Sequence, residues 1–439
     1  MSRLAILGGE PTIDAPFPVY NSIGAEEIEA VNRVMRSGVL SKFVGAWCDD
    51  FYGGETIQQF EADWSKLFRV AHCVSVNSAT SGIYAALGAV GIGPGDEVIV
   101  PPFTMSATAM APLIYGGIPV FVDIEPETFC LDPQQVRANI TTRTKAIIVV
   151  NLFGHAAQLK ELRALADEHG IKLIEDNAQG PLATESGKFA GTIGHIGVFS
   201  LNYHKHIHTG EGGMCVTEDE NLARRMQMIR NHGENVVEAQ GIEDLTNLVG
   251  YNYRMTELCA AVGIEQLKKA ELHVSRREQM AAGLSQATGG LAGITPPVVR
   301  PGCRHVYYVW AARYDEEIVG VSREVFSEAL AAEGVPNAVG YVEPLYMLPL
   351  FQKKIALGRS GFPFNLSERQ YLAGMCPVTE RMHQRELLEF HICSHEISEQ
   401  QMDLVGRAFG KVHAARTELQ KLEKSRLEER GIVVGSRRS

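Results

Sequence analysis

The sequence predicts an α/β protein built on a mostly parallel sheet. Short apolar runs alternate with longer amphipathic segments between about residues 55 and 270. Runs such as "AIIVV" are apolar throughout, which is typical of strands buried on both faces. Strands that alternate with helices form βαβ crossovers, and these crossovers set neighbouring strands parallel. Catalytic loops are then expected beyond the carboxyl ends of the strands.

The predicted elements fall into a large and a small unit. Strands are expected within residues 73–78, 96–102, 118–124, 145–154 and 172–178, with helices within 79–91, 105–117 and 159–170. Further along, a β-rich run at 304–314, a Ser-capped helix at 322–334 and a terminal helix at 398–430 indicate an α+β unit. We therefore expect an N-terminal segment packing on both domains, a large domain and a smaller C-terminal domain, over residues 1–54, 55–274 and 275–439.

Composition narrows the function classes. The net charge of −11 argues against nucleic acid or an anionic membrane surface as the main partner. The eight cysteines include no C-x-x-C pair, which favours buried free thiols in a reducing compartment. The chain shows no signal peptide and no run of about 18 apolar residues, so we expect a cytoplasmic protein without a membrane span.

Two segments in the first half could hold an anion and a cation. Ala79, Thr80 and Ser81 lie between a strand and a helix, where free backbone amides attract an anion. A plain helix cap explains them equally well. Asp176 ends a buried strand, where a carboxylate is costly without a partner such as a protonated ring nitrogen. Glu175 faces the other side of the strand and is expected to be structural.

The stretch "FSLNYHKHIHTGEGGM", residues 199–214, contains one lysine before a glycine-rich turn. Schiff-base chemistry needs one lysine whose amine reaches an aldehyde, which makes Lys205 a candidate, with Ser200 as a phosphate donor. In an extended strand, His204, His206 and His208 would share one face, opposite Lys205, and offer a zinc site. We favour the lysine and expect no metal.

The motifs in this order resemble the DegT–StrS family of sugar aminotransferases. They are "GPGDEVIVPPFT", "PVFVDIEPETFCLDP", "IEDNAQ", "FSL…K…TGEGGM", "RNHG" and "GYNYRM", and the resemblance covers nearly the whole chain. These are fold-type I pyridoxal-phosphate enzymes. The resemblance implies a seven-stranded-type, mostly parallel sheet between helices and a smaller C-terminal α+β domain.

The resemblance also implies roles for individual residues. Lys205 matches the lysine that carries the cofactor, and Asp176 matches the partner of the pyridine nitrogen. Gln179 matches the residue beside the phenolic oxygen, and Asn252 matches a phosphate contact from the neighbouring subunit, which implies a homodimer with shared active sites. The phosphate cradle matches Thr80, Ser81 and Ser200, beside Ala79.

Two positions depart from the family pattern. Ala79 stands where the family usually has glycine, and Met105 stands where an aromatic residue usually covers the cofactor ring. A thioether packs on a ring face without the same stacking geometry. Phe103 takes that place only if the local backbone differs.

The implied activity is transfer of an amino group from an amino acid, glutamate or glutamine, to a keto sugar, with pyridoxamine phosphate as the intermediate cofactor form. A nucleotide-linked sugar is the expected acceptor, and a cyclitol ketone is the alternative. A sugar dehydratase and a non-catalytic regulator that binds the cofactor remain further alternatives. Four residues are candidates for the acceptor pocket, although structural roles suit them equally well: His232, His305, Tyr307 and Tyr346.

Overall fold

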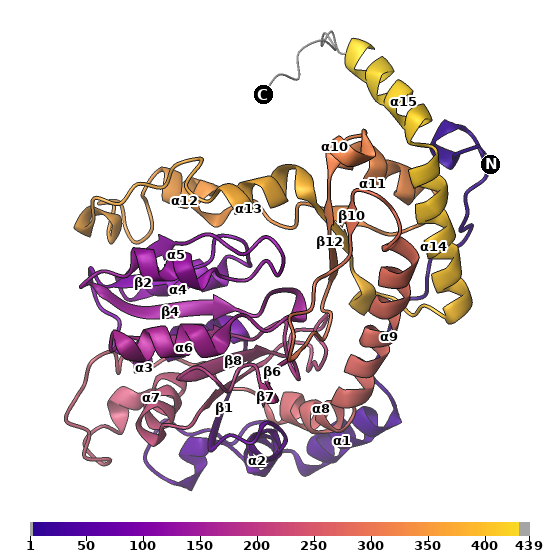
Figure 1. The fold of residues 1–439 in the computed structure, drawn as a ribbon. Helices are drawn as coiled ribbons and strands as arrows, with labels where there is room; N and C mark the ends of the chain where they lie inside the picture. The colour runs from indigo at the N-terminus through magenta and orange to yellow at the C-terminus, as the bar shows by residue number, and fades with distance from the viewer. Residues whose placement is uncertain (1–2, 430–439) are drawn as a thin grey trace.

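The computed structural model describes residues 3–429, apart from the side chain of Cys393. Its main sheet has seven strands in the order β1-β9-β8-β5-β4-β2-β3 (Figure 1). Only β9 runs antiparallel to its neighbours, which confirms the mostly parallel sheet. The strands in this order are β1 (His72–Val76), β9 (Gly213–Thr217), β8 (Ile196–Ser200), β5 (Lys172–Asp176), β4 (Thr144–Val150), β2 (Glu97–Val100) and β3 (Ile118–Phe121).

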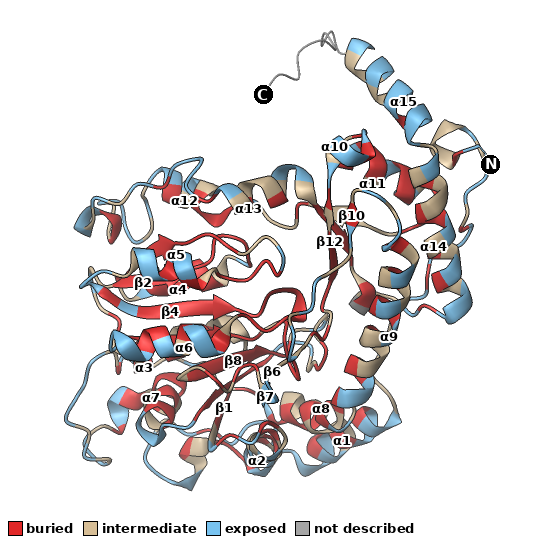
Figure 2. Cartoon of the chain, in the orientation of Figure 1, coloured by how far each residue is buried: buried red, intermediate tan, exposed pale blue. Residues whose placement is uncertain are grey.

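Both faces of this sheet are covered by helices, because alternate side chains of the buried strands enter two different cores. On β4, Ile147 and Val149 join one core, while Ala146 and Ile148 join the other. Figure 2 shows the strands buried and the outer helix faces exposed. The first core includes α2 (Glu55–Phe68), α5 (Pro133–Asn139), α6 (Leu159–Glu168) and α8 (Glu257–Lys268), and the second includes α3 (Ala79–Ala89), α4 (Ala107–Ile114) and α7 (Glu220–Arg230).

Helices α8 and α9 (Ala270–Thr288) lead from the large sheet to the C-terminal part of the chain. The N-terminal helix α1 (Ala25–Ser37) packs on α8, and α9 follows α8 and packs on α14 (Glu399–Ala414). The expected strand at 304–314 is divided: β11 (Cys303–Arg304) joins β6 (Thr184–Glu185) and β7 (Lys188–Phe189) beside the large sheet, and β12 (Trp310–Tyr314) lies in another sheet.

That other sheet has four strands and carries its own hydrophobic core. Its order is β10 (Ile294–Thr295), β12, β14 (Leu387–Phe390) and β13 (Ala338–Val339), with helices α10 (Glu316–Val319), α11 (Arg323–Ala332) and α14 beside it. The expected single terminal helix is two, since α15 (Arg416–Glu429) begins after a break at Ala415. In Figure 1, α15 extends away from the rest of the structure.

Residues 345–376 return to the large sheet after β13. Tyr346, Phe351 and Tyr371 belong to the same buried core as Phe121 on β3. This segment includes α12 (Pro349–Gln352) and leads into α13 (Pro377–Arg381), and both lie near the β2–β3 edge (Figure 1). The division at residue 275 stays a prediction, since part of the predicted small domain packs on the large one.

The described cysteines agree in part with the prediction of buried free thiols. All seven cysteines with described side chains are free. Four of them are buried, as expected, whereas Cys48 is exposed: the buried ones are Cys73, Cys130, Cys215 and Cys376. Among residues 3–429, no helix combines the length and apolar character needed to cross a membrane.

Candidate active site

Asp176 lies at the carboxyl end of β5 and is 5% exposed. Its Oδ2 accepts a hydrogen bond from Thr108 Oγ1 at 2.7 Å, and its Oδ1 accepts one from the Ala178 backbone N–H at 3.2 Å. Burial raises the pKa of Asp176, although these hydrogen bonds and the charge of Lys205 act in the opposite direction. The site therefore holds a desolvated carboxyl group that a bound cation would stabilise as the carboxylate.

Glu175 points to the opposite face and closes a loop, as the strand alternation predicted. Its carboxylate accepts from the backbone N–H groups of Gly191, Ile193 and Gly194 at 2.5–2.7 Å. Asn151 Nδ2 adds a fourth donor at 3.2 Å. These donors account for the full burial of Glu175, which makes it a structural residue.

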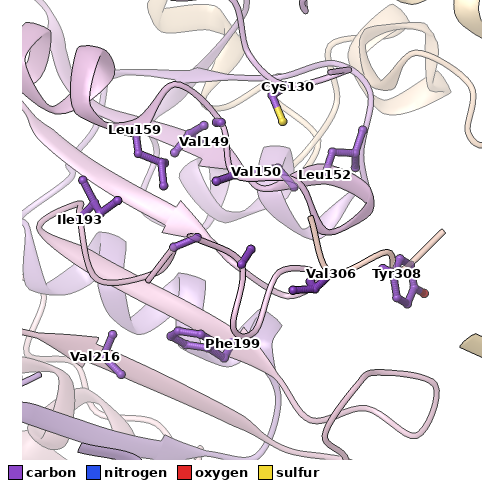
Figure 3. Packing of buried hydrophobic residues seen from close by; sticks show 14 of the residues in the cluster. Cys130, Val149, Val150, Leu152, Leu159, Ile193, Phe199, Val216, Val306 and Tyr308 are labelled. Atoms are coloured by element: carbon purple, nitrogen blue, oxygen red, sulfur yellow. The ribbon is translucent and has the colours of Figure 1, made fainter. Parts of the chain in front are cut away.

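Lys205 lies in the loop between β8 and β9. Its Nζ is 4.2 Å from the centroid of the Tyr308 ring, a distance at which the ring face attracts the ammonium group. Figure 3 shows Tyr308 on the same segment as the buried Val306. The Lys205 carbonyl accepts from Arg277 Nη2 at 3.3 Å, so α9 holds the backbone of this loop. The lysine is thus fixed at both its backbone and its amine.

The three histidines around Lys205 have different partners. Residues 202–208 form no strand, so the extended arrangement that the zinc alternative needs is absent from this described loop. His206 is buried and its Nε2 pairs with the Val306 carbonyl at 2.8 Å, whereas His208 Nε2 pairs with Ser22 Oγ at 2.9 Å. Within residues 3–429, no three His, Cys, Asp or Glu side chains gather as a metal-binding group.

Burial shifts the pKa of each of these histidines in the same direction. It lowers the pKa of His204 to about 4, with the charge of Lys205 contributing. It also lowers the pKa of His206 well below its usual value and that of His208 by less. All three imidazoles are therefore neutral near pH 7, and their ring nitrogens serve as hydrogen-bond partners rather than as charges.

The start of α3 and the end of β8 come together around Gly213. Ala79 is the first residue of α3, and Gly213 pairs with Ser200 on β8. A Cβ on Gly213 would lie 2.8 Å from the Ala79 backbone nitrogen, so only glycine permits this approach. Ser81 is 8% exposed and donates its hydroxyl hydrogen to Asn77 Oδ1 at 2.5 Å. The predicted phosphate residues, Thr80 among them, thus occupy one small region.

Gln179 follows β5 and is held on both sides of its amide. Its Oε1 accepts from the Phe153 backbone N–H at 2.7 Å, and its Nε2 donates to the Tyr341 hydroxyl at 2.9 Å. Met105 is 62% exposed, whereas Phe103 is buried and packs edge-on against the Tyr341 ring. The backbone therefore leaves Met105, and not Phe103, open to a ligand.

Asn252 is exposed and lies beside the strand that leads into α3. Its carbonyl accepts from Asn77 Nδ2 at 3.4 Å, and its Oδ1 accepts from Arg254 Nε at 2.8 Å. A backbone bridge to Asn231 fixes the segment. The described chain thus presents Asn252 to solvent close to its own α3.

The four predicted acceptor residues do not form one pocket. The His305 ring stacks on Tyr307 with 3.9 Å between centroids, and burial lowers the pKa of His305 well below its usual value. His232 is half-exposed, and its Nδ1 lies 3.5 Å from Glu234 Oε1. Tyr346 is fully buried in the core, and its hydroxyl donates to Glu380. This burial within the returning segment at 345–376 favours the structural role that suited Tyr346 equally well, and its place in an acceptor pocket stays a prediction.

Three residues at the site were not predicted from the sequence: Thr108, Tyr308 and Tyr341. Thr108 contacts Asp176, Tyr308 contacts Lys205 and Tyr341 contacts Gln179. Each is separated from its partner by at least 68 residues. No local pattern marks such pairs, so only the folded chain reveals them.

Comparison with known proteins identifies the family. Residues 21–406 match the DegT/DnrJ/EryC1/StrS aminotransferase family. The chain belongs to this family. It is therefore an aminotransferase whose cofactor is pyridoxal phosphate, and the expected fold and enzyme class are confirmed.

Proteins similar to this chain carry names that refer to different sugars and cyclitols. The chain is 36% identical over 424 residues to L-glutamine:2-deoxy-scyllo-inosose aminotransferase of Streptoalloteichus tenebrarius, covering 93% of this chain and 97% of that protein. It is 36% identical over 297 residues to GDP-perosamine synthase of Caulobacter vibrioides, covering 67% and 78%. The structure of DesI with its TDP-sugar product has a TM-score of 0.78 and 28% identity, covering 96% and 98%.

The residues present fit the cofactor of this family. Asp176 is a buried carboxyl group that needs a cation, and Lys205 is a fixed amine at the same edge of the sheet. Gly213 leaves space at the start of α3 that a Cβ would fill, and helix N-termini bind phosphate groups. The chain thus offers partners for the ring nitrogen, the aldehyde and the phosphate group.

Proposed function

We propose that this protein moves the amino group of glutamine or glutamate to the ketone of a sugar or cyclitol, using Lys205 and Asp176. The observation that carries the proposal is the placement of the buried Asp176 carboxyl near enough to Lys205 for the lysine charge to lower its pKa, at the carboxyl edge of one sheet. The cofactor supplies an electron sink that stabilises negative charge on the donor carbon.

Asp176 holds a proton on the ring nitrogen. An ionised carboxylate beside that nitrogen favours the protonated ring, and Thr108 keeps the carboxylate oriented at 2.7 Å. Gln179 contributes its amide N–H to the phenolic oxygen. The start of α3 and Ser200 bind the phosphate group through backbone N–H and hydroxyl donors.

Lys205 moves the proton. Its Nζ would take a proton from Cα of the donor amino acid and deliver it to C4′ of the cofactor, which is a general acid–base role. The ring face of Tyr308 stabilises the ammonium form of Lys205 between these two steps. Arg277 holds the loop backbone, which positions the amine for both proton transfers.

The working unit in this proposal is a cytoplasmic homodimer with shared active sites. The resemblance assigns Asn252 to the partner's cofactor, and its exposed side chain is accessible to a second copy. Large apolar side chains near the site are also exposed: Met105 at 62% and Tyr203 at 69%. A second copy would cover such side chains, and free thiols suit the reducing cytoplasm.

The acceptor we favour is a cyclitol ketone, with a nucleotide-linked keto sugar as the second candidate. The match to the inosose aminotransferase spans 97% of that protein, whereas the match to GDP-perosamine synthase spans 78%. Likeness to DesI keeps the nucleotide-linked acceptor in consideration. Both acceptors present a ketone carbon within a hydroxylated ring, so the same amine transfer serves either.

Single-turnover spectroscopy tests the proposal. The loaded enzyme is mixed with glutamine, glutamate or alanine, and the visible absorbance is followed as the cofactor is converted to its amine form. Scyllo-inosose, 2-deoxy-scyllo-inosose and TDP-linked 4-keto sugars are then added separately to restore the original spectrum. We expect conversion by glutamine or glutamate and restoration by a cyclitol ketone.

Other outcomes of this assay are equally informative. Restoration by a TDP-linked sugar alone would replace the cyclitol with the second candidate. No conversion with any amino donor would contradict an aminotransferase and favour a non-catalytic binder, and loss of a sugar hydroxyl without amine transfer would indicate a dehydratase. Lys205→Ala should abolish conversion, and the exposed Lys188→Ala serves as its control.

A further inference from the structure

Tyr341 reaches the edge of the large sheet from the smaller sheet. It follows β13, and its backbone N–H donates to Glu389 Oε1 on β14 at 2.6 Å. Its ring packs edge-on against Phe103 after β2 and Phe153 after β4, with centroids 5.7 and 5.0 Å apart. The hydroxyl is thereby fixed at the carboxyl ends of the strands, where Asp176 lies.

The hydrogen-bond directions between Gln179 and Tyr341 are determined by a backbone group. The Phe153 N–H can only donate, so the Gln179 oxygen must face it at 2.7 Å and the amide NH2 must face away. That NH2 donates to the Tyr341 hydroxyl at 2.9 Å. The phenol oxygen of Tyr341 is therefore an acceptor in this contact, and its own hydrogen remains to be donated.

Within residues 3–429, the Tyr341 hydroxyl hydrogen has no acceptor at hydrogen-bonding distance, since the hydroxyl makes only the contact with Gln179. Burial raises the pKa of Tyr341, and the charges of Glu389 and Asp176 raise it further, while the Gln179 contact lowers it. The hydroxyl therefore keeps its hydrogen throughout the neutral range. Tyr341 is half-buried, and its hydroxyl lies at the carboxyl ends of the strands with a hydrogen left to donate, so it can serve a ligand bound there.

We propose that the Tyr341 hydroxyl donates its hydrogen to the phenolic oxygen of bound pyridoxal phosphate, next to the N–H of Gln179. This inference rests on the proposed place of the cofactor at Asp176, Gln179 and Lys205. Tyr341 is then a second donor to one anionic oxygen. It links the smaller sheet directly to the electronic state of the cofactor.

The consequence is a shift in the pH at which the lysine-linked nitrogen of the bound cofactor loses its proton. Two donors reduce the negative charge on the phenolic oxygen, and that oxygen then holds the proton of the neighbouring lysine-linked nitrogen less tightly. Tyr341→Phe removes one donor, so the proton leaves at a higher pH. A charge-assisted hydrogen bond is worth about one to two pKa units, so the visible absorbance transition should rise by about one to two pH units.

The control variant is Tyr371→Phe. Tyr371 is buried and loses one hydrogen bond, from its hydroxyl to the Pro119 carbonyl at 3.0 Å, but it packs beside β3, in the core that contains Phe121. Its absorbance transition should stay at the wild-type pH. Each loaded protein is titrated by visible absorbance, and none of these measurements requires turnover.

A second substitution tests the opposite direction and covers poor folding of the first. Placing 3-fluorotyrosine at position 341 keeps the ring and strengthens the donor, so the absorbance transition should move to lower pH. A transition unchanged in both variants, with cofactor still attached at Lys205, would overturn the role of Tyr341 and leave the proposed function standing. Absence of amine transfer in the wild type would instead count against the proposed function alone.

Discussion

Replacing Thr108 with valine removes one hydroxyl group while the side chain keeps its shape. Thr108 is fully buried and donates to Asp176 Oδ2 at 2.7 Å. After the substitution, the Ala178 N–H at 3.2 Å is the remaining hydrogen bond to this carboxyl among those described. The change therefore tests how much one neutral donor contributes to the ionised form of Asp176.

The magnitude follows from the hydrogen bond. A bond to a charged group is worth about 1.5–3 kcal/mol, and one pKa unit corresponds to about 1.4 kcal/mol. Burial already raises the pKa of Asp176, and loss of Thr108 raises it further, by about one to two units. Only the ionised carboxylate pairs with a protonated ring, so cofactor affinity falls as the pH drops through this pKa.

The assay is binding of pyridoxal phosphate to the apoprotein between pH 5 and 8. We expect the acid limb of affinity to move to higher pH by about one to two units in Thr108→Val. Thr288→Val is the matched control, because Thr288 is also fully buried and donates to the Leu284 carbonyl in α9. An acid limb that stays at the wild-type pH in Thr108→Val would refute this role of Thr108.

Two further substitutions test the phosphate region and the returning segment. Gly213→Ala would place a Cβ 2.7 Å from the Ser78 carbonyl carbon, so the start of α3 must move; we expect cofactor affinity to fall about tenfold, with Gly93→Ala unchanged. Glu97→Ala removes the buried partner of Arg369, so it should lower the free energy of unfolding by about 3 kcal/mol in denaturant titrations. Glu168→Ala is the exposed control, and it should lower the free energy of unfolding by less than about 1 kcal/mol. Unchanged cofactor affinity in Gly213→Ala would contradict the close approach at the start of α3. An equal loss of stability in Glu97→Ala and Glu168→Ala would contradict the contribution of the buried ion pair.

Much of the large sheet was predictable because its strands are apolar on both faces. The run containing Ile147 and Ile148 has no polar side, which excludes an edge strand and a surface helix. The antiparallel β9 was not predictable, since its direction depends on how the loop carrying Lys205 closes. That loop is held by Arg277 and Tyr308, both distant in sequence.

The candidate site was predictable where family motifs are local. Asp176, Lys205 and the start of α3 each sit in a short motif, and the structure brings all three to one edge of the sheet. The role of Tyr346 stayed open because an aromatic residue with a hydroxyl suits a pocket and a core equally well. Tyr346 itself lies in the returning segment and packs against Phe121 of β3, and no local pattern reveals that packing.

The most direct test of the account is the position of the lysine that carries the cofactor. The loaded protein is reduced with borohydride, digested and analysed by peptide mass mapping. We predict the pyridoxyl group on the peptide containing Lys205, and its loss in Lys205→Ala with the fold retained by circular dichroism. A pyridoxyl group on Lys172 or Lys188 instead would contradict the assignment of the active site.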